Sequence, residues 1–419
     1  MKEDNLKFII NNDNIFSIQV YVPLGSINEK KGLYGISHFL EHIKFNKSKK
    51  YNKKNFIQQI NNSAISNAYT TKDHTSYYLK SNDDDYMNLI KLMNELVFNT
   101  DFKDNDIEIE KKIIEEEKMI TNPDTNVLVD IFSDIQITSQ ENPYNKKVIG
   151  TMKDIKNMTN TKLKLYNKLY LDNYLIIISC SSKLKNKVNK ICLKLFPDSL
   201  NKKIPKLKNV DKFHYSLTVR KNIDKQNNLI LVFKSFSELD DNKYYIDFIM
   251  NFLLNNKNTI LLNKLREETG FIYNLSSNNE NYRDYGSLTI IISSNKKNSI
   301  YNILKIVFKE LYKLKKEKIT KKKLDKYKNK FLNKLEYKLK DTEYLTTIIS
   351  NYMFYDRDFT IDKYINMIKK INSNQLMNVL NLLFNYNTMS IATYGNYNNI
   401  NYTKQRIFNI IDKNRKNIN

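Results

Sequence analysis

Apolar and polar residues alternate near the start of the chain, a pattern that predicts β-strands. Leu6–Pro23 is rich in Ile, Val and Phe, and alternation with a period of two places those side chains on one face of a sheet. Ile65–Leu79 alternates in the same way and predicts a pair of strands, whereas the apolar run in Tyr174–Ser179 is typical of a buried strand. Apolar residues at helical spacing predict helices over Ile36–Phe45, Lys54–Asn61, Met87–Phe98, Asp106–Ile120 and Lys185–Leu195.

The second half of the chain repeats this order of elements. It opens with predicted strands over His214–Val219 and Leu229–Phe236, passes through helices and ends in a strand followed by a helix. Asn385–Thr393 with its following helix parallels Leu171–Ser179 with the helix that follows it. We interpret the parallel as a weak internal duplication of one topology. A chance resemblance between two segments of similarly biased composition is the alternative.

A proline-containing break lies between the two halves. Two of the five prolines fall within Phe196–Pro205, and such a composition interrupts regular structure. The chain is therefore predicted to form two α+β domains, residues 1–205 and 206–419. Each is expected to be an α/β sandwich in which helices cover a sheet rich in antiparallel pairs. A length of 419 residues is sufficient for two separate cores.

The composition excludes several classes of protein. With 41% hydrophobic and 12% aromatic residues, the chain is too apolar to be wholly disordered, and no apolar run approaches the ~18 residues that a membrane-spanning helix needs. The first residues lack the apolar core of a secretory signal and the Arg-rich character of a transit peptide. Cys180 and Cys192 are too few for a disulfide framework or a cysteine zinc site. We therefore expect a cytoplasmic protein with no membrane partner.

The net charge of +24 allows two interpretations. A basic surface can bind a polyanion such as nucleic acid, but the lysines are spread along the whole chain and no nucleic-acid-binding module is recognisable. A solvated surface coated with lysine is the simpler interpretation. No specific nucleic acid is therefore predicted as a partner.

The most informative motif is His38-Phe-Leu-Glu41-His42, because the chain has only four histidines. On a helix, residues three and four apart lie on one face, so both imidazoles and Glu41 can approach one ion. Neutral imidazole is a common zinc ligand, and catalytic zinc sites combine three protein ligands with an open position for water. Because buried polar groups need a partner, a metal ion explains this face, and a pair of hydrogen-bonded core histidines is the other explanation.

A third ligand is expected among the glutamates of the predicted helix Asp106–Ile120. These glutamates are Glu108, Glu110, Glu115, Glu116 and Glu117. Helical spacing selects one core-facing stripe, which consists of Glu110, Ile113, Ile114 and Glu117. Glu115 and Glu116 are predicted to face solvent. The two glutamates of the stripe lie about 10 Å apart along the helix axis. One is therefore predicted to bind the ion, and the other to support a ligand or to line the surrounding chamber.

These residues resemble the active-site motif of the inverted zinc peptidases, the pitrilysin/insulinase family. In that family an H-x-x-E-H helix is followed by a glutamate about 75 residues later, with another glutamate seven residues before it. Further similar segments, which span nearly the whole chain, are Gly25–His42, Asn67–Tyr78, Asn142–Tyr144, Val148–Thr151, Asp172–Leu175 and Leu265–Tyr273. The chain is most similar to the short-chain branch of the family, which includes mitochondrial processing peptidase subunits and bacterial relatives.

The resemblance implies a role for each residue that matches the family's motif. His38, His42 and Glu117 would be the ligands of one Zn²⁺ per chain. Glu41 would be the general base, and Glu110 would be the supporting acidic residue.

The resemblance also implies two sets of residues that contact the substrate. Arg266 and Tyr273, in the second domain, would bind near the substrate carbonyl. From the residues alone, a helix capped by Gly270 and a tyrosine in a strand core is the alternative. The edge strand that would pair with an extended peptide contains Asn67, Ala68, Tyr69 and Thr70.

Three features lie outside the matched pattern. The family usually has a Gly-Gly pair just before the edge strand, where this chain has Asn61–Ala64. His74, within the strand segment, is predicted to be a surface residue. His214, at the start of the second half, is predicted to be structural.

The resemblance implies a zinc metalloendopeptidase with a clamshell fold, which hydrolyses peptides or unfolded segments inside a closed chamber. Zinc would lower the pKa of a water molecule, and Glu41 would accept its proton. We expect a homodimer, and a heterodimer with a related subunit is the alternative. If lysines line the chamber, acidic peptides would be favoured over basic ones. The alternative function is a non-catalytic peptide-binding or scaffold subunit of a heterodimeric peptidase, although such members usually lose the ligands that this chain retains.

Overall fold

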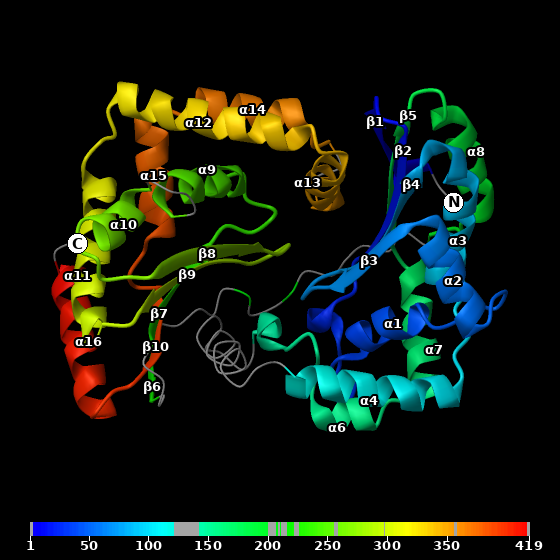
Figure 1. The fold of residues 1–419 in the computed structure, drawn as a ribbon, viewed down its shortest axis with the longest axis horizontal. Coiled ribbons are helices and arrows are strands. Elements are labelled where there is room, and N and C mark those ends of the chain that lie inside the picture. Colours follow the sequence, from blue (N-terminus) through cyan, green and yellow to red (C-terminus); the bar gives the residue numbers. More distant parts are fainter. Residues whose placement is uncertain are drawn as a thin grey trace. The chain divides into compact units, whose positions relative to one another are not determined.

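The computed structural model describes residues 3–120, 142–199, 207, 210, 216–221, 226–254, 259–296, 298–355 and 358–416. The chain forms two compact units (Figure 1). The first unit consists of Met1–Asn126, Lys146–Leu207 and Lys340–Phe354, and the second of Val127–Asn145, Lys208–Leu339 and Tyr355–Asn419. The predicted domain boundary near residue 205 and the predicted structural residue His214 both lie outside the described residues.

The sheet of the first unit has five strands in the order β1-β5-β2-β4-β3. Their bounds are β1 Leu6–Asn11, β2 Ile15–Val22, β3 Ile65–Thr70, β4 Thr75–Asn82 and β5 Leu175–Ser181. Strands β1 and β5 are parallel, and the other neighbours are antiparallel. These elements confirm the strands predicted in the first half, both those from alternation and the buried strand from the apolar run. The order leaves β3 at one edge of the sheet.

Eight α-helices of the described residues belong to the first unit. They are α1 Ile36–Lys44, α2 Lys53–Ser63, α3 Tyr86–Phe98, α4 Asp104–Ile120, α6 Met152–Lys156, α7 Asn160–Lys168, α8 Lys185–Leu195 and α13 Thr342–Tyr355. The helices predicted in the first half are confirmed to within two residues at each described end. Figure 1 shows α3 and α8 against one face of the sheet.

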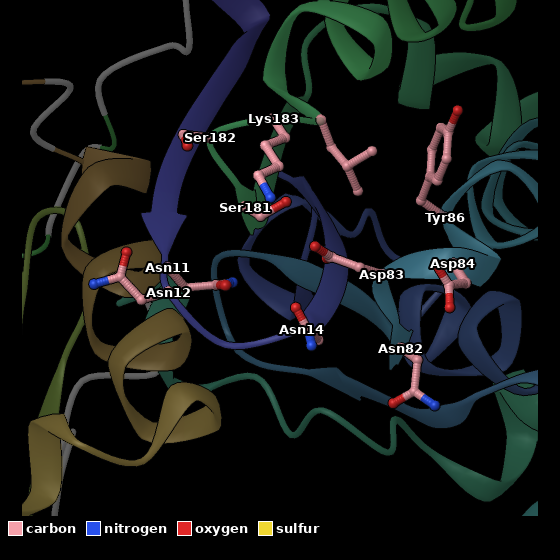
Figure 2. A pocket seen from close by; sticks show the side chains of 11 residues that line it. Asn11, Asn12, Asn14, Asn82, Asp83, Asp84, Tyr86, Ser181, Ser182 and Lys183 are labelled. Atoms are coloured by element: carbon pink, nitrogen blue, oxygen red, sulfur yellow. The ribbon is translucent and has the colours of Figure 1, made fainter.

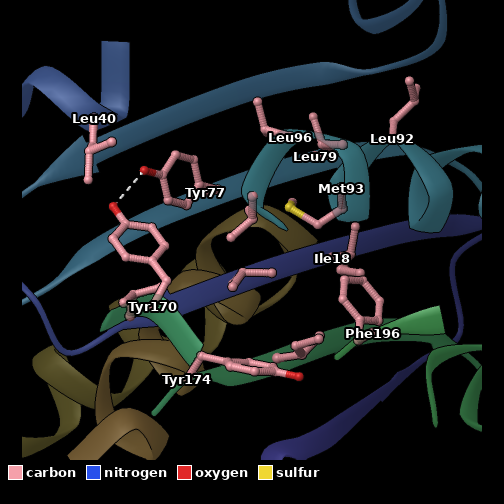
Figure 3. Close-up of a cluster of buried hydrophobic side chains, with 14 of the residues drawn as sticks. Ile18, Leu40, Tyr77, Leu79, Leu92, Met93, Leu96, Tyr170, Tyr174 and Phe196 are labelled. Atoms are coloured by element: carbon pink, nitrogen blue, oxygen red, sulfur yellow. Dashed lines mark hydrogen bonds between the residues drawn. The ribbon is translucent and has the colours of Figure 1, made fainter. Parts of the chain in front are cut away.

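The core of the first unit lies between this face and the helices. Alternation along β2 directs Ile18 and Val20 into the core. Figure 3 shows Ile18 on the side of the sheet that faces Met93 of α3. On β4, Tyr77 points to the same face, and its hydroxyl lies 3.0 Å from that of Tyr170. Each large apolar side chain buried in this way stabilises the fold by about 2 kcal/mol. The core therefore fixes α1 and α3 against the sheet.

Helix α13 covers part of the opposite face of the first sheet, although it lies late in the sequence. Because side chains alternate along a strand, Tyr21 points away from the core face that carries Val20. The Tyr21 hydroxyl donates a hydrogen bond of 2.7 Å to Asn351 Oδ1 on α13. The ring centroids of Tyr21 and Phe354 lie 5.3 Å apart. The sequence pattern did not predict this return of the chain to the first unit.

The sheet of the second unit has the order β6-β10-β7-β9-β8. Its strands are β6 Leu217–Lys221, β7 Asn227–Ser235, β8 Asn274–Asn281, β9 Gly286–Ser294 and β10 Ser390–Gly395. The β6–β10 pair is parallel, and the remaining pairs are antiparallel. Strand for strand, this is the topology of the first sheet, so the predicted internal duplication and the α+β fold class are confirmed.

Helices also cover the sheet of the second unit. The described ones are α9 Lys243–Leu253, α10 Ile260–Leu262, α11 Ser299–Lys316, α12 Lys321–Leu339, α14 Ile361–Lys370, α15 Ser373–Leu383 and α16 Ile400–Lys416. A π-helical turn, η6, spans Asn263–Glu267. Figure 1 shows α11, α15 and α16 beside β7 and β10. Among the described residues, no helix is long and apolar enough to cross a membrane.

Candidate metal centre

Helix α1, which carries the His-x-x-Glu-His motif, is held at its N-terminus by a buried carboxylate. Glu29 is 2% exposed, and its two oxygens accept hydrogen bonds from the backbone N–H groups of Gly35, at 2.7 Å, and Ser37, at 3.0 Å. A carboxylate here satisfies donors that a helix start leaves without partners. Burial raises the pKa of Glu29 to about 7, against the lowering effect of these hydrogen bonds.

The turn that leads into α1 requires glycine. Gly35 precedes the helix with a φ of 92°, in the left-handed region, where residues with a Cβ are strained. A Cβ at Gly35 would lie 2.7 Å from the carbonyl oxygen of Ile149, and a Cβ at Gly150 would collide with the carbonyl oxygen of Tyr34. The two glycines therefore allow the segment before α1 to cross the backbone near residue 150 closely.

The C-terminal end of α1 is anchored by a buried lysine. Lys44 is fully buried, and its Nζ donates hydrogen bonds to the carbonyl oxygen of Val97, at 2.7 Å, and to Asn167 Oδ1, at 2.6 Å. Burial lowers the pKa of Lys44 to about 7. These contacts tie α1 to α3 and α7.

Helix α1 has two distinct faces. One face packs into the core and is fully or almost fully buried; its residues are Ile36, Phe39, Leu40 and Ile43. The other face carries His38, Glu41 and His42, all partly buried. The imidazole centroids of His38 and His42 lie 4.6 Å apart. The predicted helix and its polar face are therefore present.

The two glutamates of α4 that helical spacing selected, Glu110 and Glu117, differ in how far they are buried. Glu110 is 4% exposed, and the side chain of Glu117 is 47% exposed. The prediction that Ile113 shares their core-facing stripe is wrong, because Ile113 is 42% exposed, whereas Ile114 is buried. Successive residues are about 100° apart around a helix, so the stripe runs through Ile107 and Ile114 and leaves Ile113 outside. For the two glutamates that were predicted to face solvent, the exposure agrees only partly with the prediction: Glu116 is exposed and Glu115 is half-buried.

His38, His42 and Glu117 come together at one point. His38 Nε2 lies 3.7 Å from Glu117 Oε1, and His42 Nε2 lies 3.4 Å from Glu117 Oε2. One ligand atom from each of the three residues lies within 4.8 Å of the other two. Within the described part of the chain, no other group of three such side chains meets this spacing. The structure thus brings together the three ligands that the family resemblance implied.

Glu110 contacts His42 but is not itself a member of the cluster. Its Oε1 lies 2.9 Å from His42 Nδ1, and its Oε2 accepts a hydrogen bond of 2.6 Å from Asn46 Nδ2. A carboxylate on Nδ1 favours the tautomer with its proton there, which leaves the lone pair on Nε2. Burial opposes ionisation, but the hydrogen bonds from His42 and Asn46 hold the pKa of Glu110 below its usual value.

The two histidines differ in their electrostatic surroundings. Burial lowers the pKa of His38 to about 4, so its imidazole is neutral at physiological pH. For His42, burial alone would lower the pKa, but the Glu110 hydrogen bond and the nearby carboxylates outweigh it and raise the pKa. His38 Nδ1 is buried and has no hydrogen-bond partner among the described residues.

The donor chemistry of this cluster fits zinc. Two imidazole nitrogens and one carboxylate oxygen form a common ligand set of catalytic zinc. The carboxylate behind His42 is the support that zinc-binding histidines usually have. The neutral, buried imidazole of His38 offers a lone pair without first losing a proton. His38, His42 and Glu117 are therefore the residues that would hold the ion.

Glu41, the predicted general base, lies beside the cluster and contacts the edge strand. Thr70 Oγ1 donates a hydrogen bond of 2.9 Å to Glu41 Oε2. Burial raises the pKa of Glu41, while this hydrogen bond acts in the opposite direction. Thr70 is the last residue of β3, so the contact joins the predicted base directly to the predicted peptide-binding strand.

The predicted substrate-binding residues all lie on β3, at the edge of the sheet; they are Asn67, Ala68, Tyr69 and Thr70. Ala68 and Thr70 face the side of α1, and Tyr69 faces the side of α13, where its hydroxyl lies 3.2 Å from that of Tyr21. The strand follows α2 through Ala64 in an extended conformation, with φ −149°. Ala64 therefore does not need the left-handed conformation that favours glycine, and the strand begins regularly although the Gly-Gly pair is missing.

His74 is not a surface residue, and this prediction is wrong. Its side chain is 12% exposed and its Nδ1 lies 2.9 Å from Asp73 Oδ1. Its ring packs against those of Tyr21 and Phe354, with centroids 5.5 Å and 5.2 Å away. The sequence could not show this, because Phe354 reaches the strand only through α13.

Arg266 and Tyr273 lie in the second unit with exposed side chains. Arg266 belongs to the π-helical turn η6, and its side chain is 55% exposed. Gly270, with φ 58°, donates its N–H to the carbonyl oxygen of Arg266 at 2.9 Å, so the predicted glycine cap is confirmed. Tyr273 is 72% exposed and precedes β8. The alternative that Tyr273 is strand core is therefore wrong.

A separate polar pocket of about 750 Å³ lies at one end of the first sheet (Figure 2). It is formed by the turn between β1 and β2, the segment after β4 and the segment after β5. The residues that line it are Asn11, Asn12, Asn14, Asn82, Asp83, Asp84, Tyr86, Ser181, Ser182, Lys183 and Leu184. It shares no residue with the metal cluster, and no predicted site residue lines it.

Sequence reasoning missed several residues that hold the site together. Glu29, Lys44 and Asn46 all contact the elements that carry the ligands. Lys44 and Asn46 lie in a chain crowded with both residue types, so composition gave no signal for them. Glu29 lies nine residues before His38, inside a segment that is similar to the family. It could therefore have been considered as a cap of the predicted helix.

Comparison with known proteins gives a consistent picture. Residues 8–151 match the family model "Insulinase (Peptidase family M16)", and residues 162–331 match "Peptidase M16 inactive domain". The chain is 24% identical to an uncharacterized zinc protease, YmxG, of Bacillus subtilis (strain 168) over 385 residues, which is 91% of this chain and 93% of that protein. It is 28% identical over 159 residues to mitochondrial-processing peptidase subunit beta of Saccharomyces cerevisiae, covering 38% of this chain and 34% of that subunit.

The fold agrees with these sequence matches. A crystal structure of a protease from Helicobacter pylori superposes with a TM-score of 0.83 at 21% identity, over 93% of this chain and 96% of the other. The two matched models follow one another along the chain, and both belong to the same peptidase family. The chain therefore belongs to the insulinase family of peptidases, peptidase family M16.

Proposed function

We propose that the protein is a zinc-dependent endopeptidase. The observation that carries the proposal is the meeting of His38, His42 and Glu117 beside Glu41. A metal site alone would explain the first three residues, but a carboxylate adjacent to the ligands supplies a proton acceptor as well. The relative from Bacillus subtilis, similar over nearly its whole length, is named a zinc protease.

The residues of this chain divide the work of hydrolysis among them. When bound, zinc would supply Lewis-acid polarisation of the scissile carbonyl and a water molecule of lowered pKa. Glu41 accepts a proton as water attacks and returns it to the leaving amine. Thr70 holds the Glu41 carboxylate in place, and Glu110 holds the ring of His42.

The substrate is an extended peptide that pairs with β3. An edge strand offers backbone N–H and C=O groups to a new strand, so it selects an extended shape rather than a sequence. Asn67, Ala68, Tyr69 and Thr70 are the residues that would make these pairs. Thr70 ends the strand at Glu41, so a peptide paired along β3 leads towards the proposed base. Folded proteins cannot provide such a free strand, which restricts the substrates to peptides and unfolded segments.

The second unit contributes Arg266 and Tyr273 to the same reaction as donors for the substrate carbonyl region. Their exposed side chains are available to a ligand. A tyrosine hydroxyl and a guanidinium are suited to developing negative charge. Replacing Tyr273 with phenylalanine is expected to lower kcat about a hundredfold without changing the zinc content. An unchanged kcat would remove Tyr273 from the mechanism.

The protein works as a dimer that encloses the peptide in a chamber. A homodimer is the first expectation, and pairing with a related subunit is the alternative. A yeast relative is named as the beta subunit of a processing peptidase, which supports an assembly of more than one chain.

We place this peptidase in the cytoplasm, because its two cysteines are too few for the disulfide framework of a secreted protein.

The competing function is a non-catalytic member of the family. The later of the two family models that match the chain is described as an inactive domain. That description applies to residues 162–331, whereas the ligand cluster and Glu41 lie in the first 120 residues. The complete set of ligands and base favours the hydrolase.

The deciding experiment measures zinc content and peptide cleavage together. Wild-type protein is expected to bind one Zn²⁺ per chain and to cleave unstructured peptides. Glu41→Gln is expected to retain zinc but to lose about 10²–10⁴-fold in kcat, the contribution typical of a general base. Glu116→Gln, an exposed glutamate on α4, is the matched control and should behave as wild type. Wild-type protein without zinc, or an active Glu41→Gln, would refute the proposal.

A further inference from the structure

Asn46 lies one helical turn after His42, just beyond the end of α1. Backbone hydrogen bonds from Phe45 N to His42 O, at 3.2 Å, and from Asn46 N to Ile43 O, at 3.1 Å, continue the coil past Lys44. Residues four apart on a coil lie on one side, so Asn46 stands on the side of His42. Asn46 is 7% exposed, which is unusual for asparagine and calls for a polar partner.

That partner is the carboxylate that already contacts the metal-ligand ring. Asn46 Nδ2 donates a hydrogen bond of 2.6 Å to Glu110 Oε2, and Glu110 Oε1 lies 2.9 Å from His42 Nδ1. The three side chains thus form one series, Asn46–Glu110–His42. Its far end is His42 Nε2, which lies 3.4 Å from Glu117 Oε2 in the cluster.

A single hydrogen bond would not fix the orientation of Glu110. A carboxylate held at one oxygen turns about its terminal torsion, which has a broad energy minimum. Glu110 is 4% exposed, so its second oxygen would also be left without a partner in a buried place. The amide of Asn46 removes both problems. With both oxygens engaged, the plane of the carboxylate and therefore the direction of the His42 ring are fixed.

The two histidines differ in this respect. His42 has a carboxylate and an amide behind it, whereas His38 Nδ1 has no hydrogen-bond partner among the residues that the structure describes. The ring of His38 therefore lacks the hydrogen-bonded support at Nδ1 that His42 has. Of the two histidine rings, the one that hydrogen bonds orient at Nδ1 is therefore that of His42, through Glu110 and Asn46.

We propose that Asn46 is a positioning residue for the metal ligand His42, acting through Glu110. The inference rests on the proposed zinc site. Substitution of residues behind metal ligands usually lowers metal affinity roughly 10–100-fold. Because Asn46 is one hydrogen bond further from the ion than Glu110, Asn46→Ala is expected at the low end, at about a tenfold loss.

The first test measures zinc affinity by chelator competition and the visible absorption of the Co²⁺-loaded protein. Asn46→Ala is expected to weaken zinc binding about tenfold and to alter the Co²⁺ bands, which report ligand geometry. Asn46→Ser retains an O–H donor and should restore most of the affinity. Asn62→Ala, an exposed asparagine on α2, is the matched control and should leave both readouts unchanged. An Asn46→Ala protein with wild-type affinity and wild-type Co²⁺ bands would overturn the inference.

The second test asks whether Asn46 acts through Glu110. In a double-mutant cycle, residues that act in series show strong coupling. Asn46→Ala is therefore expected to have almost no further effect on zinc affinity in a Glu110→Ala background. The same loss in both backgrounds would show that Asn46 acts by another route and would overturn the inference. Wild-type protein that binds no zinc refutes the proposed function itself, whereas tight wild-type binding with an indifferent Asn46 refutes only this inference.

Discussion

Helices α1 and α9 each follow the second strand of a five-stranded sheet, and the two sheets have the same strand order. Each helix also contacts the edge strand of its own sheet, β3 for α1 and β8 for α9. On α1, one face is apolar and the other carries His38, Glu41 and His42. On α9, apolar side chains are buried around most of the helix, and Asp247 lies on the exposed part.

The difference shows that the fold provides a place for a site but does not create one. Both helices bury an apolar face, which is what the sheet requires of them. Only the first unit adds two imidazoles on α1 and two glutamates on α4. The family models agree for these helices. Helices α1 and α4 lie within residues 8–151, which match the insulinase model, and α9 lies within residues 162–331, which match the model described as inactive. Duplication therefore conserved the scaffold, and the chemistry depends on a few side chains.

The largest effect is expected from removing a ligand on α1. His42→Ala removes one of three metal-binding groups, so zinc affinity is expected to fall by at least about a thousandfold, more than for a supporting residue. Asp247→Ala on α9 is the matched substitution in the second unit; Asp247 accepts a hydrogen bond of 3.4 Å from Tyr364. Titration with zinc should separate the two variants clearly. Loss of zinc on substitution of Asp247 would contradict the contrast between the units.

A Cβ at Gly150, where the backbone passes close to the segment before α1, should destabilise the fold more than a Cβ at Gly32. Gly150→Ala places a Cβ against the carbonyl oxygen of Tyr34 at a φ of 73°, and we expect a loss of about 4 kcal/mol in unfolding free energy from strain and collision together. A Cβ added at Gly32, which has φ 85°, would have no atom within 4 Å. Gly32→Ala should therefore lower the unfolding free energy by only about 1 kcal/mol. Urea denaturation measures both. Equal losses would mean that the close crossing near α1 is unimportant.

The pH dependence of stability should contain a contribution from Glu29 in the first unit. Its pKa is raised from 4.5 to about 7 on folding, so the neutral form is favoured in the folded state. This contribution is fully present below pH 4.5 and is lost as the pH rises through 7. Relative to Glu29→Gln, wild type is expected to lose up to about 3 kcal/mol between pH 4 and pH 8. Urea midpoints across this range measure the difference, and parallel curves for the two proteins would contradict it.

The smallest effect is expected from the contact between the edge strand and the base. Thr70→Val removes the hydroxyl that donates to Glu41 and is expected to lower kcat about tenfold, the value of one hydrogen bond to a charged group. Zinc content should not change. Thr70→Ser keeps the hydroxyl and is the matched control. If Thr70→Val were as active as Thr70→Ser, β3 would contribute to peptide binding only.

Much of the fold could be predicted from the sequence because it depends on local periodicity. Alternation identified β1 to β4, a continuous apolar run identified β5, and helical spacing identified α1, α3 and α8, since these patterns reflect how each element faces a core. The parallel between the two strand–helix endings predicted the repeated topology. Ile113 shows the limit of this reasoning. Its position at the border of the α4 stripe was decided by how α4 sits on its neighbours and not by the spacing of its own residues.

The sequence alone determined the chemistry of the site: two histidines and a glutamate at helical spacing, and two further glutamates seven residues apart on another helix. Their spacing is local, so a helix fixes it before any packing occurs. Only the tertiary structure decided which groups stand behind them. The contacts of Asn46 with Glu110, of Thr70 with Glu41 and of α13 with Tyr21 join residues 64, 29 and 330 positions apart. No local pattern encodes such pairs, because they form only where the core places distant elements side by side.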